Sequence, residues 1–237
     1  MTAGEVRSGS MQEKGSVMGG WMRAAIGCMA LWRIGAQYRK LVRSPSDIHQ
    51  HLPLLRELSR SCTTVCEMGV RKCVSSWAFL MGLAENPCEK KELLCVDLVP
   101  TDIRPLIRWG ANLVPAVRVS MQVQDSRTIR LIHDFDLLFI DTLHVYGQLK
   151  AELWAHEARI RRFICLHDTE VDKVEGEVRR MGWDARKVAK ETGMTEEEVS
   201  RGLGPALEEF LVAFPSWKVW RHDQHNNGLT VLIREPV

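Results

Sequence analysis

The chain has 237 residues, of which 45% are hydrophobic and 26% are charged, so it has the length and apolar content of one large globular domain. Its net charge of +2 provides no general electrostatic attraction to nucleic acid or to an acidic membrane surface, so neither is an expected partner. The seven cysteines are odd in number and contain no CxxC pair, which favours a reducing, cytoplasmic location over a disulfide scaffold.

Residues 1–44 are expected to form an extension that precedes the main domain at 45–237. Residues 1–16 are rich in glycine and serine, and we expect them to be disordered. The next apolar stretch is interrupted by Arg23 and Arg33 and is shorter than a clean membrane-spanning helix. It also lacks a convincing cleavage site. We therefore predict an amphipathic helix that packs on the domain or on a partner, with a signal anchor as the alternative.

Beyond the extension, short apolar runs alternate with stretches that have the hydrophobic period of a helix. Five runs are too short for helices and are predicted to be buried strands, at 63–67, 93–96, 116–119, 137–140 and 163–166. Helices are predicted around Leu52 to Leu58, after a cap at Ser75 or Ser76, at 102–109, along an apolar face from Val145 to Ile160, and at 205–214. Strands that alternate with helices predict a doubly wound parallel sheet.

The C-terminal part departs from this alternation. Residues 217–220 and 229–233 are predicted strands on either side of Asn227-Gly228, a dipeptide that strongly favours a hairpin turn. The sheet is therefore expected to finish with an antiparallel pair. Residues 172–204 are predicted to be a helical insert.

Part of this insert, 185–202, imitates a helix-turn-helix. Its second helix would open with Glu196, Glu197 and Glu198, whose carboxylates would repel the phosphates of nucleic acid. We therefore expect the insert to be a lid or a packing element.

Polar residues and a glycine follow the first three predicted strands, at the edge where open α/β sheets bind ligands. Gly69 lets the backbone approach a ligand, and Asp97 can accept hydrogen bonds from both hydroxyls of a ribose. Asp125 follows the third strand, near where an adenine amino group would lie. A GxGxxG motif is absent because Cys73 and Val74 stand where glycines would be expected, which argues against a cofactor of the NAD type.

The fourth and fifth strands end in residues that can bind metal or transfer protons. Asp141 ends the fourth strand and His144 follows three residues later, while His167 and Asp168 end the fifth. In the alternative interpretation, Asp141 only caps the next helix and His144 is a core histidine. Two such strand ends in one chain favour a functional site.

These motifs resemble those of class I S-adenosylmethionine-dependent methyltransferases, especially the branch with sugar and macrolide O-methyltransferases and cephalosporin-hydroxylase-like proteins. The residues that carry the resemblance are Glu67-Met-Gly69, Asp97, Asp125, Asp141-Thr-Leu-His144 and His167-Asp168-Thr169. It extends in layout over roughly 45–237. It implies an α/β fold with a Rossmann-like, seven-stranded, mostly parallel sheet, helices on both faces and an antiparallel C-terminal hairpin.

The resemblance also implies a role for each of these residues. Glu67 and Gly69 would line the methionine portion of S-adenosylmethionine, Asp97 would hold its ribose, and Asp125 would lie beside its adenine. The glycine-poor loop at 71–74 departs from the family pattern and puts cofactor affinity in question.

Asp141, His167 and Asp168 would bind a divalent metal, magnesium or manganese, and His144 would be the general base. His167 stands where many relatives have a carboxylate, and an added imidazole shifts the preference toward manganese, iron or zinc. Thr142 replaces the usual glycine after the aspartate.

The sequence thus leads to two hypotheses. The first is a metal-assisted, S-adenosylmethionine-dependent O-methyltransferase that acts on a hydroxyl of a sugar or small metabolite. The second is a methyltransferase-like domain without activity that serves in binding or assembly, which the altered glycine loop favours. A homo-oligomer is compatible with both.

Overall fold

The computed structural model describes residues 11–235 and contains one seven-stranded sheet with the order β3-β2-β1-β4-β5-β7-β6. The strands are β1 Thr64–Met68, β2 Lys91–Asp97, β3 Val117–Val123, β4 Phe135–Ile140, β5 Ile160–His167, β6 Trp217–Asp223 and β7 Leu229–Arg234. The first five are parallel, and β7 pairs antiparallel with both β5 and β6. This arrangement confirms the predicted fold class.

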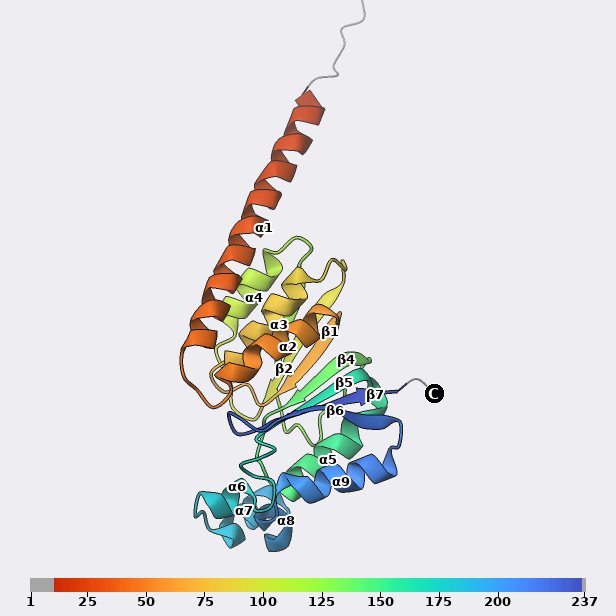
Figure 1. Ribbon diagram of the computed structural model, residues 1–237. Coiled ribbons are helices and arrows are strands. Elements are labelled where there is room, and N and C mark those ends of the chain that lie inside the picture. The colour runs from red at the N-terminus through yellow and green to blue at the C-terminus, as the bar shows by residue number, and fades with distance from the viewer. Residues whose placement is uncertain (1–10, 236–237) are drawn as a thin grey trace, which may run out of the picture.

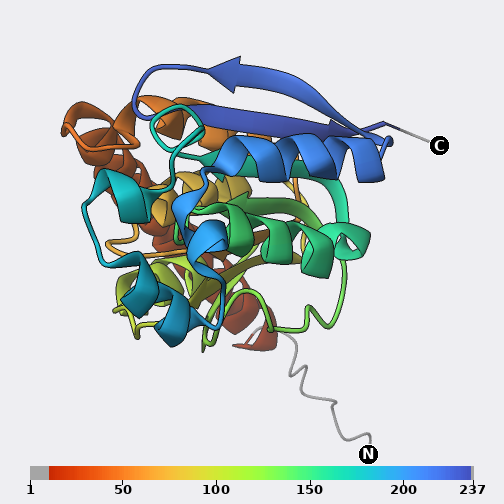
Figure 2. The same cartoon turned by 90° about the horizontal axis from the view of Figure 1, so that it is seen from below.

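Helices cover both faces of the sheet (Figure 1). One face carries α1 Met11–Arg43, the short 3-10 helix η1 His49–His51, α2 Leu52–Arg60, α3 Val74–Glu85 and α4 Arg104–Ala111. The other face carries α5 Tyr146–His156 and α9 Leu203–Ala213, which lie side by side next to the β6–β7 hairpin (Figure 2). A second 3-10 helix, η2 Glu157–Arg159, connects α5 to β5.

The central strand β4 shows why this sheet needs both helical layers. All six of its residues are buried. Leu137 and Phe139 face the core under α1–α4, whereas Leu138 and Ile140 face the core under α5 and α9. Full burial of each such side chain stabilises the fold by about 1.5–3 kcal/mol, so a strand in this position must be apolar on both sides. The carboxyl end of β4 is thereby held rigidly at the centre of the ligand edge.

The N-terminal helix α1 packs on α3 and α4 through Ala30, Ile34 and Tyr38. Its first half extends beyond the sheet layers (Figure 1) and exposes Trp21, and Trp32 in its second half is also exposed. Residues 11–16, which we expected to be disordered, form the start of this helix, and 1–10 lie outside the described residues. Within the described part of the chain, no helix is long and apolar enough to cross a membrane.

The expected insert contains three short helices, α6 Glu177–Arg180, α7 Ala185–Thr192 and α8 Glu196–Ser200. They share a small apolar core with Val145 at the start of α5. The acidic residues that imitate a recognition helix stand in the first turn of α8, where carboxylates stabilise the helix dipole. Thr195 and Glu198 form a capping box at the same place.

Two local predictions were wrong. Neither Ser75 nor Ser76 caps α3, whose N-cap is Cys73, and the Ser75 hydroxyl instead donates a hydrogen bond to buried Glu67. Ile160 belongs to the start of β5 and not to the apolar face of α5, because the chain leaves the helix at His156.

Candidate cofactor pocket and acid–histidine cluster

The loop after β1 has the backbone shape of a glycine-rich loop although it contains a single glycine. Gly69 has φ +85°, and a Cβ atom there would lie 1.9 Å from the carbonyl oxygen of Asp141, so no other residue fits. Arg71 and Cys73 are also left-handed, with φ of 45° and 59°. Each such non-glycine residue costs about 1–2 kcal/mol, which the surrounding contacts must offset.

Asp97, at the end of β2, provides some of these contacts. Its Oδ2 accepts hydrogen bonds from the backbone N–H groups of Val70 at 2.8 Å and Arg71 at 3.1 Å. Its Oδ1 accepts a bond from the N–H of Val99 at 3.0 Å. The carboxylate expected to hold a ribose therefore also fixes the loop that follows β1.

A pocket of about 220 Å³ opens at this edge of the sheet and is lined by Gly69, Asp97, Asp125 and Asp141 among others. The structure thus brings together three of the four predicted cofactor residues. The fourth, Glu67, does not line the pocket: its side chain is fully buried, bonded to Ser75. The volume of the pocket is below the range of about 300–1,000 Å³ that is typical of small-molecule sites.

Burial raises the pKa of Glu67 to about 7, an effect increased by the negative charge of Asp141 and opposed by hydrogen bonds from Ser75 and Cys95. The carboxyl group lies beneath the loop that follows β1, since Ser75 belongs to the first turn of α3. Glu67 therefore contacts the start of α3 and not the pocket, so it can influence ligand binding only by positioning the loop and the helix.

Arg127 is a pocket residue that the sequence did not indicate. Its guanidinium pairs with Asp125 at 2.6 Å and also donates a hydrogen bond to the carbonyl oxygen of Thr192 in the insert, at 2.9 Å. The arginine holds the pKa of Asp125 below its ordinary value. The predicted adenine-side acid is thus already paired, and this pair connects the pocket to α7.

Thr142 explains one departure from the family pattern. Its hydroxyl lies 2.9 Å and 3.0 Å from the two carboxylate oxygens of buried Glu152 on α5 and donates to them. A glycine at this position could not form that bond. The threonine therefore ties the loop after β4 to the helix that follows it.

Asp141, His144, His167 and Asp168 meet at the ends of β4 and β5, and we call them the acid–histidine cluster. Nε2 of His144 lies 3.1 Å from an oxygen of Asp141 and 3.1 Å from an oxygen of Asp168. Nδ1 of His167 lies 3.2 Å and 3.0 Å from the same two oxygens. The strands that carry the cluster are parallel neighbours. These four contacts form a closed ring in which two carboxylates alternate with two imidazoles. All four side chains are buried.

The charges within the cluster depend strongly on one another. Burial lowers the pKa of His167, but the hydrogen bonds and charges of Asp141 and Asp168 outweigh it and raise that pKa to about 10. The pKa of His144 is also raised well above its ordinary value, because the aspartates again outweigh burial. The two imidazoles hold the pKa of Asp141 well below its ordinary range. When no metal is bound, the two aspartates therefore favour the protonated form of both imidazoles.

Two acidic residues from the start of the insert face the other side of His144, and the sequence did not indicate them. Nδ1 of His144 lies 3.4 Å from Asp172 and 3.5 Å from Glu177. Asp172 is fully buried and is also bound by Arg180 at 2.6 Å. Nδ1 of His144 and Oδ1 of Asp168 have no hydrogen-bond partner of good geometry although both atoms are buried.

The donor set fits a metal ion. Asp141, His167 and Asp168 have donor atoms close enough to share one ion, and so do His144, Asp168 and Asp172. Nitrogen and oxygen ligands that lie about 2.0–2.2 Å from one ion are separated from each other by roughly 3 Å, as the alternating atoms of the cluster are. A bound cation would replace the protons that the two imidazoles otherwise hold.

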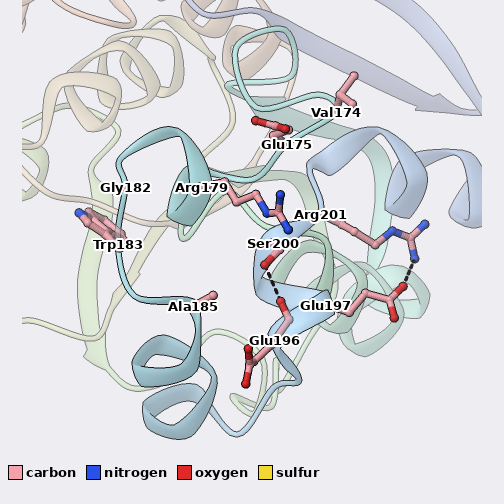
Figure 3. Close-up of a pocket in the computed structure, with 10 residues that line it drawn as sticks. All are labelled: Val174, Glu175, Arg179, Gly182, Trp183, Ala185, Glu196, Glu197, Ser200 and Arg201. Atoms are coloured by element: carbon pink, nitrogen blue, oxygen red, sulfur yellow. Dashed lines mark hydrogen bonds and ion pairs between the residues drawn. The ribbon is translucent and has the colours of Figure 1, made fainter.

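A larger pocket, of about 860 Å³, lies within the insert and not at the strand ends (Figure 3). Arg179 and Trp183 contribute to one side, and Glu197 and Arg201 to the other, where the last two form an ion pair at 3.7 Å. The pocket combines an aromatic ring with charged groups, a combination suited to a polar small molecule.

No family model and no curated protein sequence matches the chain. Among solved structures, it is similar to an O-methyltransferase family protein from Burkholderia thailandensis, with a TM-score of 0.51 and 11% identity. That match covers 85% of this chain and 59% of the other. The chain has the class I methyltransferase fold. The sheet order and the antiparallel end of this fold are those described above.

Two further similarities concern proteins of comparable size. The N-methyltransferase NodS from Bradyrhizobium japonicum matches over 80% of this chain and 94% of its own, with 15% identity and a TM-score of 0.49. The S-adenosylhomocysteine-bound methyltransferase PaMTH1 from Podospora anserina matches over 99% of this chain and 100% of its own, with 13% identity and a TM-score of 0.45.

Proposed function

We propose that this protein is an S-adenosylmethionine-dependent O-methyltransferase that uses a divalent metal to act on a hydroxyl of a sugar or another small metabolite. One observation carries the proposal: the alternating carboxylates and imidazoles of the acid–histidine cluster, 3.0–3.2 Å apart, lie at the ligand edge of a methyltransferase fold.

The cofactor would occupy the pocket lined by Gly69, Asp97 and Asp125. Gly69 would allow the close approach of the backbone, and Asp97 would accept hydrogen bonds from the ribose with its remaining lone pairs. Asp141 belongs both to the pocket lining and to the acid–histidine cluster. The methyl donor and the metal would therefore lie on either side of one carboxylate, which is the proximity that an in-line transfer needs.

A bound metal would lower the pKa of the acceptor hydroxyl and hold its oxygen in place. Asp141, His167 and Asp168 would hold this ion, as the sequence led us to expect. Manganese, iron or zinc suit two imidazoles and two carboxylates better than magnesium does.

The role of His144 divides the mechanism into two versions. As a general base it would need a free lone pair near the acceptor, but its Nε2 faces the carboxylates of Asp141 and Asp168. We therefore propose that His144 is a further metal ligand, and we keep the general base as the alternative. Metal content in the His144→Ala variant separates them: a ligand is needed to retain metal, whereas a base is not.

The acceptor would bind on the side of the insert. The insert begins directly after Asp168, and Asp172 and Glu177 face the cluster from it. The pocket beside Arg179 and Trp183 offers room for a polar acceptor or for part of one. Deleting the insert should therefore reduce acceptor turnover more than cofactor binding. Equal loss of both in a folded variant would contradict a lid.

A second function has a specific observation in its favour. The pocket of about 220 Å³ is small, and Arg71 and Cys73 place side chains where a glycine-rich loop has none. These features favour a domain that has lost catalysis and serves in binding or assembly.

Calorimetric titration with S-adenosylhomocysteine tests the proposal, first with metal present and then after chelation. Micromolar binding, together with methyl transfer to small hydroxyl compounds that stops on chelation and returns with Mn²⁺, is the expected result. An absence of binding in a folded protein would favour the assembly role. Full activity after chelation would refute metal assistance and leave the rest of the proposal standing.

A further inference from the structure

A second group of histidine and carboxylate side chains lies where η1 contacts the tip of the β6–β7 hairpin. His51, Asp223 and His225 each offer one donor atom within 4.8 Å of the others. His51 is 1% exposed, Asp223 is half-buried and His225 is exposed. More than 170 positions separate His51 from the other two, so only the tertiary structure brings them together.

In addition to His51, the side chain of Asn226 holds the hairpin tip in place. The side chain of Asn226 accepts a hydrogen bond from the N–H of Gln50 at 2.9 Å and donates one to the carbonyl oxygen of Ser46 at 2.8 Å. Asn226 and Asn227 are both left-handed, with φ of 50° and 70°, which makes the tip compact. The donor atoms are therefore preorganised, and binding a ligand to them costs little conformational entropy.

The backbone carbonyls of the hairpin tip fix the tautomer of the His51 ring. Its Nε2 lies 3.0 Å from the carbonyl oxygen of His225 and 3.2 Å from that of Asn226. Carbonyl oxygens only accept hydrogen bonds, so Nε2 carries the proton, and Nδ1 of the neutral ring carries a lone pair. Nδ1 is buried without a hydrogen-bond partner. A backbone carbonyl that fixes the tautomer of the ring is the usual support of a ligating histidine.

We propose that His51, Asp223 and His225 bind a borderline divalent cation such as Zn²⁺, at a site separate from the acid–histidine cluster. Two imidazoles and one carboxylate suit Zn²⁺ or Co²⁺ and not Mg²⁺, which prefers oxygen ligands. Ligand atoms of a tetrahedral zinc site lie roughly 3.3–3.6 Å apart. The three donor atoms now lie within 4.8 Å of one another, so they must draw together, which rotation of the exposed His225 side chain allows. Asp223 also accepts a bond from Arg221 at 2.9 Å, which leaves lone pairs for the ion.

The ion would link two distant parts of the chain beside the proposed active site. The carbonyl oxygen of Asn226 lies 3.2 Å from Nε2 of His51 and 3.3 Å from Nε2 of His167, which belongs to the acid–histidine cluster. The rings of His51 and His167 are in edge contact, with centroids 5.8 Å apart. An ion on His51 and His225 would therefore hold the hairpin tip, and with it one wall of that cluster.

The test uses the full-length protein freed of metal and titrated with Zn²⁺ and, for its visible spectrum, Co²⁺. The wild type should bind one equivalent of Zn²⁺ more than His225→Ala does. Added Zn²⁺ should also raise the Tm of the wild type by several degrees more than it raises the Tm of His225→Ala. His225 is exposed, so its loss does not endanger folding. His133→Ala is the control, because His133 is another surface histidine, paired with Glu92 away from the hairpin.

Asp141→Asn separates this proposal from the proposed function, because the readout is metal content and not activity. This variant should lose the equivalent held by the acid–histidine cluster and retain the one that depends on His225. Equal Zn²⁺ stoichiometry and an equal Tm shift in the wild type and His225→Ala would overturn the site. That result would leave the acid–histidine cluster, and the methyltransferase proposal, unaffected.

Discussion

The two ends of the ligand edge differ in what their carboxylates contact. On the cofactor side, Asp97 is bonded to backbone N–H groups and Asp125 to Arg127, so each acid already has partners within the chain. On the side of the acid–histidine cluster, the side chains of Asp141 and Asp168 pair with the two histidines. Nδ1 of His144 and Oδ1 of Asp168 are buried there without a hydrogen-bond partner of good geometry. Acids that are bonded within the chain help to shape the pocket, whereas a buried polar atom without a partner requires an explanation such as a bound ion or water.

The largest expected effect tests the acid–histidine cluster. His144→Ala should slow methyl transfer by about 10²–10⁴-fold in either version of the mechanism. If His144 is a ligand, metal content should fall together with turnover, as we expect. The measurement is turnover, metal content and Tm on the same preparation, with the exposed acid of Asp134→Asn as the control variant. Full turnover per folded molecule would show that His144 is only a packing residue.

The next effect concerns Glu67, the acid buried beneath the cofactor side. Its pKa in the folded protein, about 7, exceeds its ordinary value of 4.5. The stabilising contribution of the protonated carboxyl group to the free energy of unfolding is therefore complete below pH 4.5 and is lost as pH rises through 7. We therefore compare the free energy of unfolding of Glu67→Gln with that of the wild type. The difference between them should shift by about 3 kcal/mol in favour of the variant between pH 4.5 and pH 8.

Chemical denaturation of both proteins at several pH values measures this difference. If the free energies of unfolding of the wild type and Glu67→Gln differ by the same amount at every pH, Glu67 ionises normally in the folded protein.

A smaller effect tests the cofactor side directly. Asp97→Ala removes an acceptor with charge, and S-adenosylhomocysteine binding should weaken by about 1.5–3 kcal/mol. Part of this loss passes through the loop, because Asp97 also holds Val70 and Arg71. Asp97→Asn keeps an acceptor oxygen and should retain part of the affinity. Unchanged calorimetric affinity in both variants would refute the ribose contact.

The smallest effect concerns the insert. Thr195→Ala removes the capping box of α8 and should destabilise the insert by about 1 kcal/mol without unfolding the sheet. Hydrogen exchange should increase in 195–200 and stay constant in β4 and β5. Ser200→Ala, at the other end of α8, is the matched control and should change exchange less. Uniform exchange across the molecule would show that the insert does not open by itself.

The sequence predicted most of the residues of both sides but not their partners. Gly69, Asp97, Asp125, Asp141, His144, His167 and Asp168 were all found as polar groups or glycine at strand ends. Arg127, Asp172 and Glu177 were not, because they lie outside such ends and act through contacts with distant residues. Glu67 was predicted to face the cofactor, yet alternation along β1 turns its side chain toward Ser75.

The sequence by itself determined the fold, because apolar runs of strand length that alternate with helical periods admit few other sheets. It also determined that carboxylates and imidazoles meet at one edge, since parallel strands share their carboxyl ends. Only the tertiary structure decided which of these groups have hydrogen-bond partners and which do not. Satisfaction depends on hydrogen bonds between residues far apart in the chain, as between His51 and the carbonyl of Asn226, and no local pattern encodes them.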